Sequence, residues 1–246
     1  MAPIRPSLLC LAVFICFIRE TTCCSLTTSA MAASPSAEIP FDFRLVHDGF
    51  ASALVEDEDV DMEQYLLAYK ELYKFFQLMG TVFSFVGSDV KAKIDILEDF
   101  SNSSDGQHFA TVKSMIKYEM EQNLLKKKDY VSGSRTLLRL HRGLDFIKLF
   151  LQRVGELSDT DGTSSAGHEA YNATLAKHHP WIIRKGATVA MYALPTRKDL
   201  LIKVCGNNDE CVQRALDVLP KMILAADEVY ARTEQCYTEN DLHGLP

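Results

Sequence analysis

The sequence predicts an all-α fold of about eight helices in one domain. From about residue 40 onwards, apolar residues recur at steps of three and four, which is the spacing of one helix face. No segment alternates apolar and polar residues with period two for long enough to predict a sheet. The chain has 246 residues, of which 47% are hydrophobic, so it can bury a sizeable core.

Capping and breaking residues set the helix bounds in the first half of the domain. Gly80 ends the second apolar-periodic run. Ser88 is a candidate N-cap, because its hydroxyl can accept a hydrogen bond from a free backbone N–H of the first turn. The predicted helices are residues 43–54, 65–79, 89–100 and about 109–128.

Similar signals divide the second half. Ser132 and Gly133 open a long helix. Pro180 suits the first position of a helix, where its missing N–H has no helical partner, and Pro195 stops that helix. The predicted helices are about 134–157, 166–178, 180–194, 196–205 and 209–236.

Residues 1–40 form a segment apart from the domain at 41–246. Arg5 precedes an apolar run over residues 8–18, which is too short to span a bilayer but suits the core of a signal peptide. In the other interpretation Met31 is the true start and the run is an upstream extension. A Ser/Ala/Pro-rich linker follows, and both interpretations stay open.

Charge and cysteine content exclude several classes. A net charge of −7 argues against a dedicated nucleic-acid binder. The domain keeps three cysteines, Cys205, Cys211 and Cys236, an odd number without metal-ligand spacing. These predict neither a disulfide-stapled nor a zinc-ribbon fold, and they favour a reducing compartment.

The motifs of common enzymes are missing. The sequence has no GxSxG elbow, P-loop or GxGxxG fingerprint. His178 and His179 are adjacent, so on a helix they point in different directions and do not readily bind one metal ion. No pair of carboxylates lies on an apolar face. The sequence therefore predicts a protein that is not an enzyme, with no catalytic residue, cofactor or metal site.

A run of basic residues is the main chemical signal. Arg135, Arg139 and Arg142 are spaced by four and three, so they share one helix face. Like charges at this spacing repel by a few tenths of a kcal/mol per pair, roughly. A phosphate group would offset the repulsion, because guanidinium groups bind it through two parallel hydrogen bonds. Taken alone, the run fits a solvated basic stripe better.

Two further features are considered together with this run: the pair Asp89 and Lys93, and the segment from His179 to Trp181. Asp89 and Lys93 are four residues apart, and in isolation they form an ordinary surface ion pair. His179 is expected at a helix N-cap with its ring directed away from the helix. Trp181 is the only tryptophan of the chain; it is either a core residue or an anchor at a membrane interface, where indole is favoured.

Together these segments resemble the glycolipid transfer protein superfamily, and most closely its ceramide-1-phosphate branch. The resemblance spans about Pro40 to Pro246 and rests on several motifs in the same order. The matching stretches are Gly80–Val90, Arg135–Arg142, Tyr171–Leu175, His179–Arg184 and Leu194–Arg197.

The resemblance implies a fold and a site. The fold is a two-layer helical sandwich that encloses a hydrophobic lipid pocket beneath a surface site for the lipid headgroup. In the family, the residue matching Asp89 accepts hydrogen bonds from the ceramide amide and hydroxyl, and the residue matching His179 donates to the amide carbonyl. The residues matching Lys93, Arg135 and Arg139 hold the phosphate.

Two positions favour the phosphate branch. Glycosphingolipid carriers have an asparagine in place of Lys93 and a sugar-stacking tryptophan in place of Arg139. Trp181 already belongs to another motif, so no tryptophan remains to stack on a sugar.

The sequence thus predicts a monomeric carrier of ceramide-1-phosphate between membranes, with transient membrane contact through Trp181. Alternatives are glycosphingolipid transfer and a lipid-sensing module that transfers little. The expected compartment is the cytosol with peripheral membrane association. A secreted or lumenal protein is the alternative if the N-terminal segment acts as a signal peptide.

Overall fold

The structure, a computed structural model, describes residues 41–81 and 83–246; the N-terminal segment of residues 1–40 lies outside the described residues. Nearly all regular structure in the described residues is helical. Besides the helices there is one short antiparallel hairpin of β1 (Leu54–Val55) and β2 (Asp59–Val60). The α-helices are α2 (Phe43–Ala53), α3 (Met62–Leu78), α4 (Ser84–Ser101), α5 (Val112–Glu121), α6 (Gly133–Gly155), α7 (Ser164–Ala173), α8 (Trp181–Met191), α9 (Arg197–Cys205) and α10 (Asp209–Glu239), and the 3-10 segments are η2 (Glu56–Glu58), η3 (Gly106–Phe109) and η4 (Leu175–His178).

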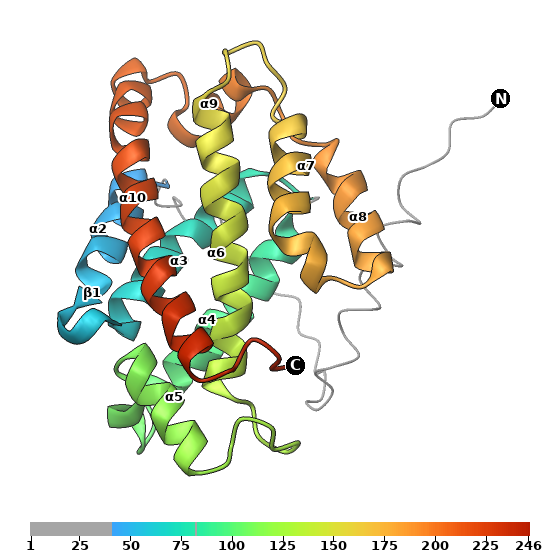
Figure 1. Ribbon diagram of the computed structural model, residues 1–246. Helices are drawn as coiled ribbons and strands as arrows, with labels where there is room; N and C mark the ends of the chain where they lie inside the picture. The colour runs from blue at the N-terminus through green and yellow to red at the C-terminus, as the bar shows by residue number, and fades with distance from the viewer. Residues whose placement is uncertain (1–40, 82) are drawn as a thin grey trace, which may run out of the picture.

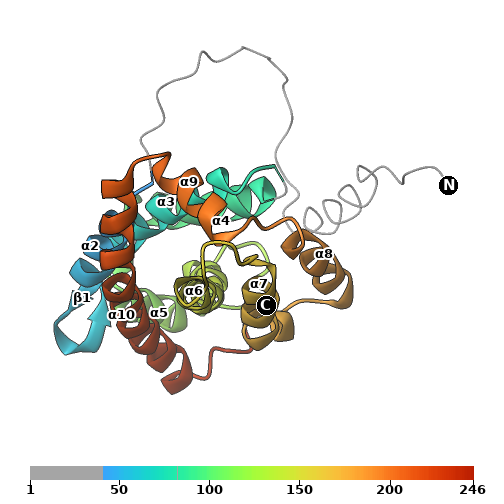
Figure 2. The same cartoon turned by 90° about the horizontal axis from the view of Figure 1, so that it is seen from above.

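The helices form two layers (Figures 1 and 2). One layer contains α3 and α4, and the facing layer contains α10, α6 and α7. Helix α2 packs against both α3 and α10 and so closes one side, whereas α8 packs against α7 at the other side. The all-α, two-layer fold is therefore confirmed.

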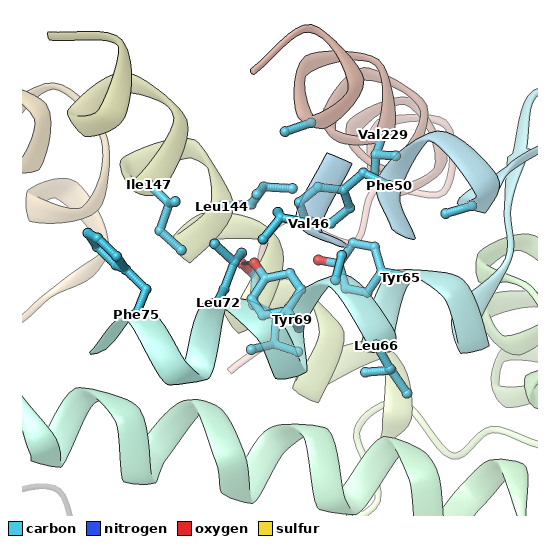
Figure 3. Packing of buried hydrophobic residues seen from close by; sticks show 14 of the residues in the cluster. Val46, Phe50, Tyr65, Leu66, Tyr69, Leu72, Phe75, Leu144, Ile147 and Val229 are labelled. Carbon is cyan, nitrogen blue, oxygen red and sulfur yellow. Dashed lines mark hydrogen bonds between the residues drawn. The ribbon is translucent and has the colours of Figure 1, made fainter. Parts of the chain in front are cut away.

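Aromatic side chains fill the space between the layers (Figure 3). Phe50 of α2 packs against Tyr65 and Tyr69 of α3, with ring centroids 5.9 and 6.1 Å apart. The buried Tyr69 hydroxyl donates to the Leu140 carbonyl at 2.5 Å, so a polar atom in the core has a partner. Tyr237 donates to the Ser134 carbonyl at 2.6 Å. Both bonds fix α6, which carries the predicted basic residues, against the core.

Some helix bounds differ from the predicted ones. Helix α4 begins at Ser84, so Ser88 lies inside the helix, where its hydroxyl donates to the Ser84 carbonyl at 2.9 Å. The buried Phe83 directly precedes this helix and anchors its start in the core. Helix α5 ends at Glu121, because Asn123 turns the chain with a φ of 54°.

A disulfide joins Cys205, the last residue of α9, to Cys211 in the first turn of α10. The odd number of cysteines in the domain did not indicate a pair. The third cysteine, Cys236, is buried and free. The cysteine count predicted no disulfide-stapled fold, and it did not indicate this single bond. The bond removes the argument for a reducing compartment, since disulfides persist in oxidising compartments and are rare in the cytosol.

Candidate functional site

Helix α4 contributes an acidic and a basic group to the site. Lys93 Nζ donates to Asp89 Oδ1 at 2.5 Å, one helical turn away. The Lys93 side chain is only 14% exposed, whereas that of Asp89 is 41% exposed. A carboxylate has more lone pairs than this one bond uses. Asp89 can therefore accept further hydrogen bonds from a ligand while Lys93 stays beside it.

Helix α6 contributes the guanidinium groups. Ser132 caps the helix by accepting from the Arg135 N–H at 3.1 Å. The half-buried Arg135 donates through Nη2 to the Tyr130 carbonyl, and Arg139, one turn further on, is exposed. Burial and the charge of Arg139 lower the pKa of Arg142. The two guanidinium groups therefore repel each other, and a bound anion would relieve that repulsion.

His141 and Arg142, in the same segment, connect α6 to other parts of the fold. Arg142 Nη2 donates to the His243 carbonyl at 2.7 Å, which ties α6 to the C-terminal segment. His141 is buried; its Nε2 lies 2.6 Å from Glu234 Oε2 and its ring stacks on Tyr230. Arg142 thus bonds to a backbone carbonyl. Arg135 is half-buried and Arg139 is exposed, and both stay candidates for binding an anion.

His179 precedes α8 in extended backbone, but Pro180, not His179, occupies the N-cap position. The predicted cap role of His179 is therefore wrong. Its ring is held in place by Tyr171, whose hydroxyl lies 2.9 Å from His179 Nδ1. Burial lowers the pKa of His179, so the ring is neutral at pH 7; Asp89 opposes this shift and Arg142 adds to it. His179 therefore lies within electrostatic reach of both α4 and α6.

Tyr171 on α7 is a site residue to which sequence reasoning gave no role. Burial raises the pKa of Tyr171 to about 12, so the phenol keeps its proton and can donate to Nδ1 of His179. That bond leaves the imidazole proton on Nε2, where it can be donated to a ligand. The only sequence signal was the place of Tyr171 in one matching stretch.

Glu119 on α5 was also missed. Its carboxylate is fully buried and accepts from four donors at the start of α6: Ser132 Oγ at 2.7 Å, Gly133 N at 2.7 Å, Ser134 N at 2.9 Å and Tyr130 Oη at 3.0 Å. A negative charge at a helix N-terminus also interacts favourably with the helix dipole. Glu119 therefore fixes the helical turn that presents Arg135.

The structure thus brings together Asp89 and Lys93 in direct contact, and His179 within reach of Asp89. Arg135 and Arg139 lie one turn apart on the neighbouring α6, which packs against α4. The set offers an acceptor, a neutral donor and three cations. Such a set can bind an amide and a phosphate, but their roles as headgroup ligands stay a prediction.

The cavity at one end of the apolar interior is small. A cavity of about 30 Å³ lies between α2, α3, α6, α9 and α10. This is about the space of two water molecules, so a lipid chain enters it only if helices move apart. Its lining residues are Phe43, Phe75, Leu151, Val154, Gly155, Arg197, Leu200, Leu201, Val204, Ala215, Leu216 and Leu219.

Helix α8 presents an exposed apolar face. Trp181 is 63% exposed, and Val189 and Tyr192 follow it along the helix with 53% and 73% exposed. The exposed Arg184 and Lys185 lie beside them. Trp181 is therefore a surface residue and not a core residue.

Within residues 41–81 and 83–246, no cluster of three His, Cys, Asp or Glu side chains could hold a metal ion. In the same part of the chain, every helix is too short or too polar to cross a bilayer.

Comparison with known proteins places this chain in a family. Residues 60–206 match the family described as glycolipid transfer protein. A ceramide-1-phosphate transfer protein of Danio rerio is 39% identical over 211 residues, which are 84% of this chain and 98% of the relative. The human protein of the same name is 33% identical over 215 residues, covering 85% of this chain and 99% of the relative.

Solved structures of proteins with the same name are similar to this chain in fold. The crystal structure of mouse ceramide-1-phosphate transfer protein in its apo form superposes with a TM-score of 0.78 at 35% identity, covering 84% of this chain and 100% of that one. Human ceramide-1-phosphate transfer protein in complex with 2:0 ceramide-1-phosphate superposes with a TM-score of 0.75 at 32% identity, covering 85% and 100%. Because the family match spans more than half of the chain and these relatives align over nearly their full length, this chain belongs to the glycolipid transfer protein family.

Proposed function

We propose that this chain binds one ceramide-1-phosphate molecule and carries it between membranes, without catalysing a reaction. The observation that carries the proposal is the placement of Lys93 beside Asp89 on α4, next to the guanidinium face of α6. Cations in these places suit a phosphate, which Arg binds in bidentate fashion. The relatives in the comparison are named for transfer of this lipid, and the human structure contains it.

In the proposed complex each group has one task. Asp89 accepts hydrogen bonds from the ceramide amide and hydroxyl, and the Nε2–H of His179 donates to the amide carbonyl. Lys93, Arg135 and Arg139 bind the phosphate oxygens. All five side chains come from one chain, so the site requires no second copy and the carrier acts as a monomer.

The apolar interior explains why a protein is needed. Removing a lipid chain from a bilayer costs about 0.8 kcal/mol per CH₂, or on the order of 12 kcal/mol for a chain of about 16 carbons. Burial of the same apolar area between the two helix layers offsets most of this cost. The charged site then selects the headgroup.

A vesicle assay tests the proposal directly. Donor vesicles hold fluorescent ceramide-1-phosphate or a fluorescent monoglycosylceramide, and transfer to acceptor vesicles is followed over time. We expect the phosphate lipid to move at least about tenfold faster, a difference of about 1.4 kcal/mol. Faster transfer of the sugar lipid would assign the chain to glycolipid transfer, and stoichiometric binding without transfer would indicate a lipid sensor.

We also propose that the exposed face of α8 is the membrane contact. Trp181→Ala should reduce the transfer rate about tenfold, a loss of about 1.4 kcal/mol, because indole is favoured at the headgroup zone of a bilayer. Thermal stability should stay unchanged, since Trp181 contributes little to the core. The exposed Ile202 of α9 offers a matched control, and Ile202→Ala should transfer normally. Equal rates for the two variants would exclude this face.

A further inference from the structure

We propose that the Cys205–Cys211 disulfide determines which lipid chain lengths the carrier accepts, by restraining the end of the apolar interior at α9 and α10. The inference rests on the proposed carrier function. With the disulfide intact the interior opens little and shorter acyl chains are favoured; with the disulfide reduced, longer chains are admitted.

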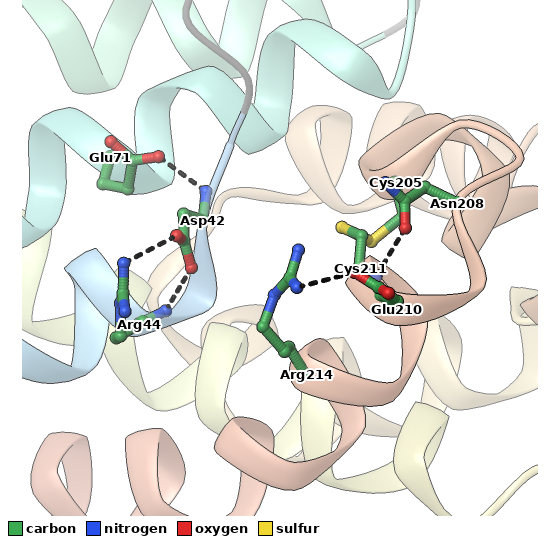
Figure 4. The surroundings of a disulfide bond; sticks show 8 residues. All are labelled: Asp42, Arg44, Glu71, Cys205, Asn208, Glu210, Cys211 and Arg214. Atoms are coloured by element: carbon green, nitrogen blue, oxygen red, sulfur yellow. Dashed lines mark hydrogen bonds and ion pairs between the residues drawn. A yellow bond between two sulfur atoms is a disulfide. The ribbon is translucent and has the colours of Figure 1, made fainter.

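The disulfide closes the corner between two helices (Figure 4). The Cα atoms of Cys205 and Cys211 are 5.5 Å apart, and the turn between them contains Gly206 with a φ of 63°. Asn208 caps α10 by accepting from the Cys211 N–H at 2.9 Å. The bond therefore fixes the C-terminal end of α9 directly to the first turn of α10.

This corner forms one wall of the cavity. Leu200 and Val204 reach it from α9, and Leu216 and Leu219 reach it from α10. Leu151 of α6 lines it as well. Val204 directly precedes a disulfide cysteine, so any widening of the cavity on this side moves the residues that the disulfide joins.

Helix α9, which lines one side of the cavity, has little buried surface. Of its nine residues only Leu200 and Val204 are buried. Its N-terminal end is fixed by the Arg197 N–H, which donates to the Asp161 carbonyl at 2.9 Å, and by an ion pair between Arg197 and Asp159. A short helix with little buried surface opens at low free energy. The disulfide therefore supplies the second anchor, at the other end of the helix.

Helix α10 can bend beside the cavity. Pro220 lies inside this helix and has no N–H, so the Leu216 carbonyl loses its helical partner. Leu216 and Leu219 precede this break, whereas the rest of α10 packs along α2 and α6. The first turns of α10 can thus tilt away from α9, a movement that the disulfide resists.

The distance along α6 places the cavity at the methyl end of a bound chain. Twelve residues separate Arg139, at the proposed headgroup site, from Leu151 at the cavity. At 1.5 Å per residue they span about 18 Å. One leaflet of a bilayer is about 15 Å thick in its hydrocarbon part. A chain that starts at the headgroup site therefore ends at the corner that the disulfide restrains.

Reduction releases the restraint by ordinary thiol–disulfide exchange. A small dithiol gives up two electrons and two protons and becomes a disulfide, while the Cys205–Cys211 bond becomes two thiols. Both sulfurs stay bound to their own residues, so only the restraint is lost.

The test compares ceramide-1-phosphate species with acyl chains of about 12 and about 24 carbons, as labelled lipids in the vesicle assay. We expect the long-to-short ratio of transfer rates to rise about fivefold on treatment with dithiothreitol, and equally in the double variant Cys205→Ser/Cys211→Ser. The variant Cys236→Ser is the control, because this buried thiol lies outside the corner, and it should respond to dithiothreitol like the wild type.

Hydrogen exchange of the α9 amides gives a second readout that needs no lipid. Exchange at residues 200–204 should speed up on reduction, and wild-type protein with dithiothreitol suffices if the double variant does not fold. An unchanged ratio with transfer still present, or unchanged exchange, overturns the inference alone. Loss of ceramide-1-phosphate transfer in every form overturns the proposed function, and the exchange data then decide whether the disulfide restrains α9.

Discussion

Arg139→Leu should lower the transfer rate of ceramide-1-phosphate about 30- to 100-fold. The substitution keeps a long side chain on α6 but removes charged hydrogen bonds to the phosphate, each of which contributes about 1.5–3 kcal/mol. Because Arg139 is exposed in the lipid-free protein, the fold should not change. The measurement is vesicle-to-vesicle transfer, with circular dichroism and thermal unfolding as checks on the fold.

Arg153→Leu is the matched control for this prediction. Arg153 lies on the same helix, is exposed, and pairs with Glu156 at 3.2 Å, away from the proposed headgroup site. It should transfer at the wild-type rate. If a folded Arg139→Leu variant transferred as fast as this control, the assignment of the phosphate to α6 would be wrong.

Glu119→Ala should lower the free energy of unfolding by about 3–4 kcal/mol, which corresponds to a fall in melting temperature of about 10 °C for a chain of this size. The reason is that Glu119 accepts four hydrogen bonds at the buried start of α6, and alanine leaves those donors without a partner. Urea unfolding measures the effect. Phosphate-lipid transfer at low temperature should fall too, because Arg135 follows the capped turn directly.

Glu121→Ala provides the comparison, since Glu121 is exposed two residues further along α5. Its loss should change stability by less than about 0.5 kcal/mol. Similar small losses for both variants would mean that water replaces the Glu119 carboxylate, and that the start of α6 is held by Ser132 and the core alone.

Most of the fold could be predicted because the apolar spacing along each helix is regular. Ser132 and Gly133, for example, open α6 as predicted, and the Ser132 hydroxyl accepts from the Arg135 N–H. The start of α4 could not be predicted, because it depends on where Phe83 is buried and not on a local cap. Local signals identify elements well and locate their ends less well.

Of the candidate site, the sequence indicated the charged residues and His179. Asp89 and Lys93 contact each other as their spacing indicated. Tyr171 was not identified because a tyrosine in an apolar helix face looks like a core residue until its hydroxyl is seen beside His179. Glu119 did leave a signal: it follows Val112, Met115 and Ile116 at helical spacing, so a carboxylate stands on an apolar face.

The length of α6 has a consequence for engineering and for divergence within the family. The proposed headgroup site and the apolar cavity lie at different ends of the one helix α6, separated by about 18 Å. Substitutions that far apart usually have additive effects on free energy. A new headgroup preference and a new chain preference can therefore be acquired independently, in either order, and combined in one protein without each undoing the other.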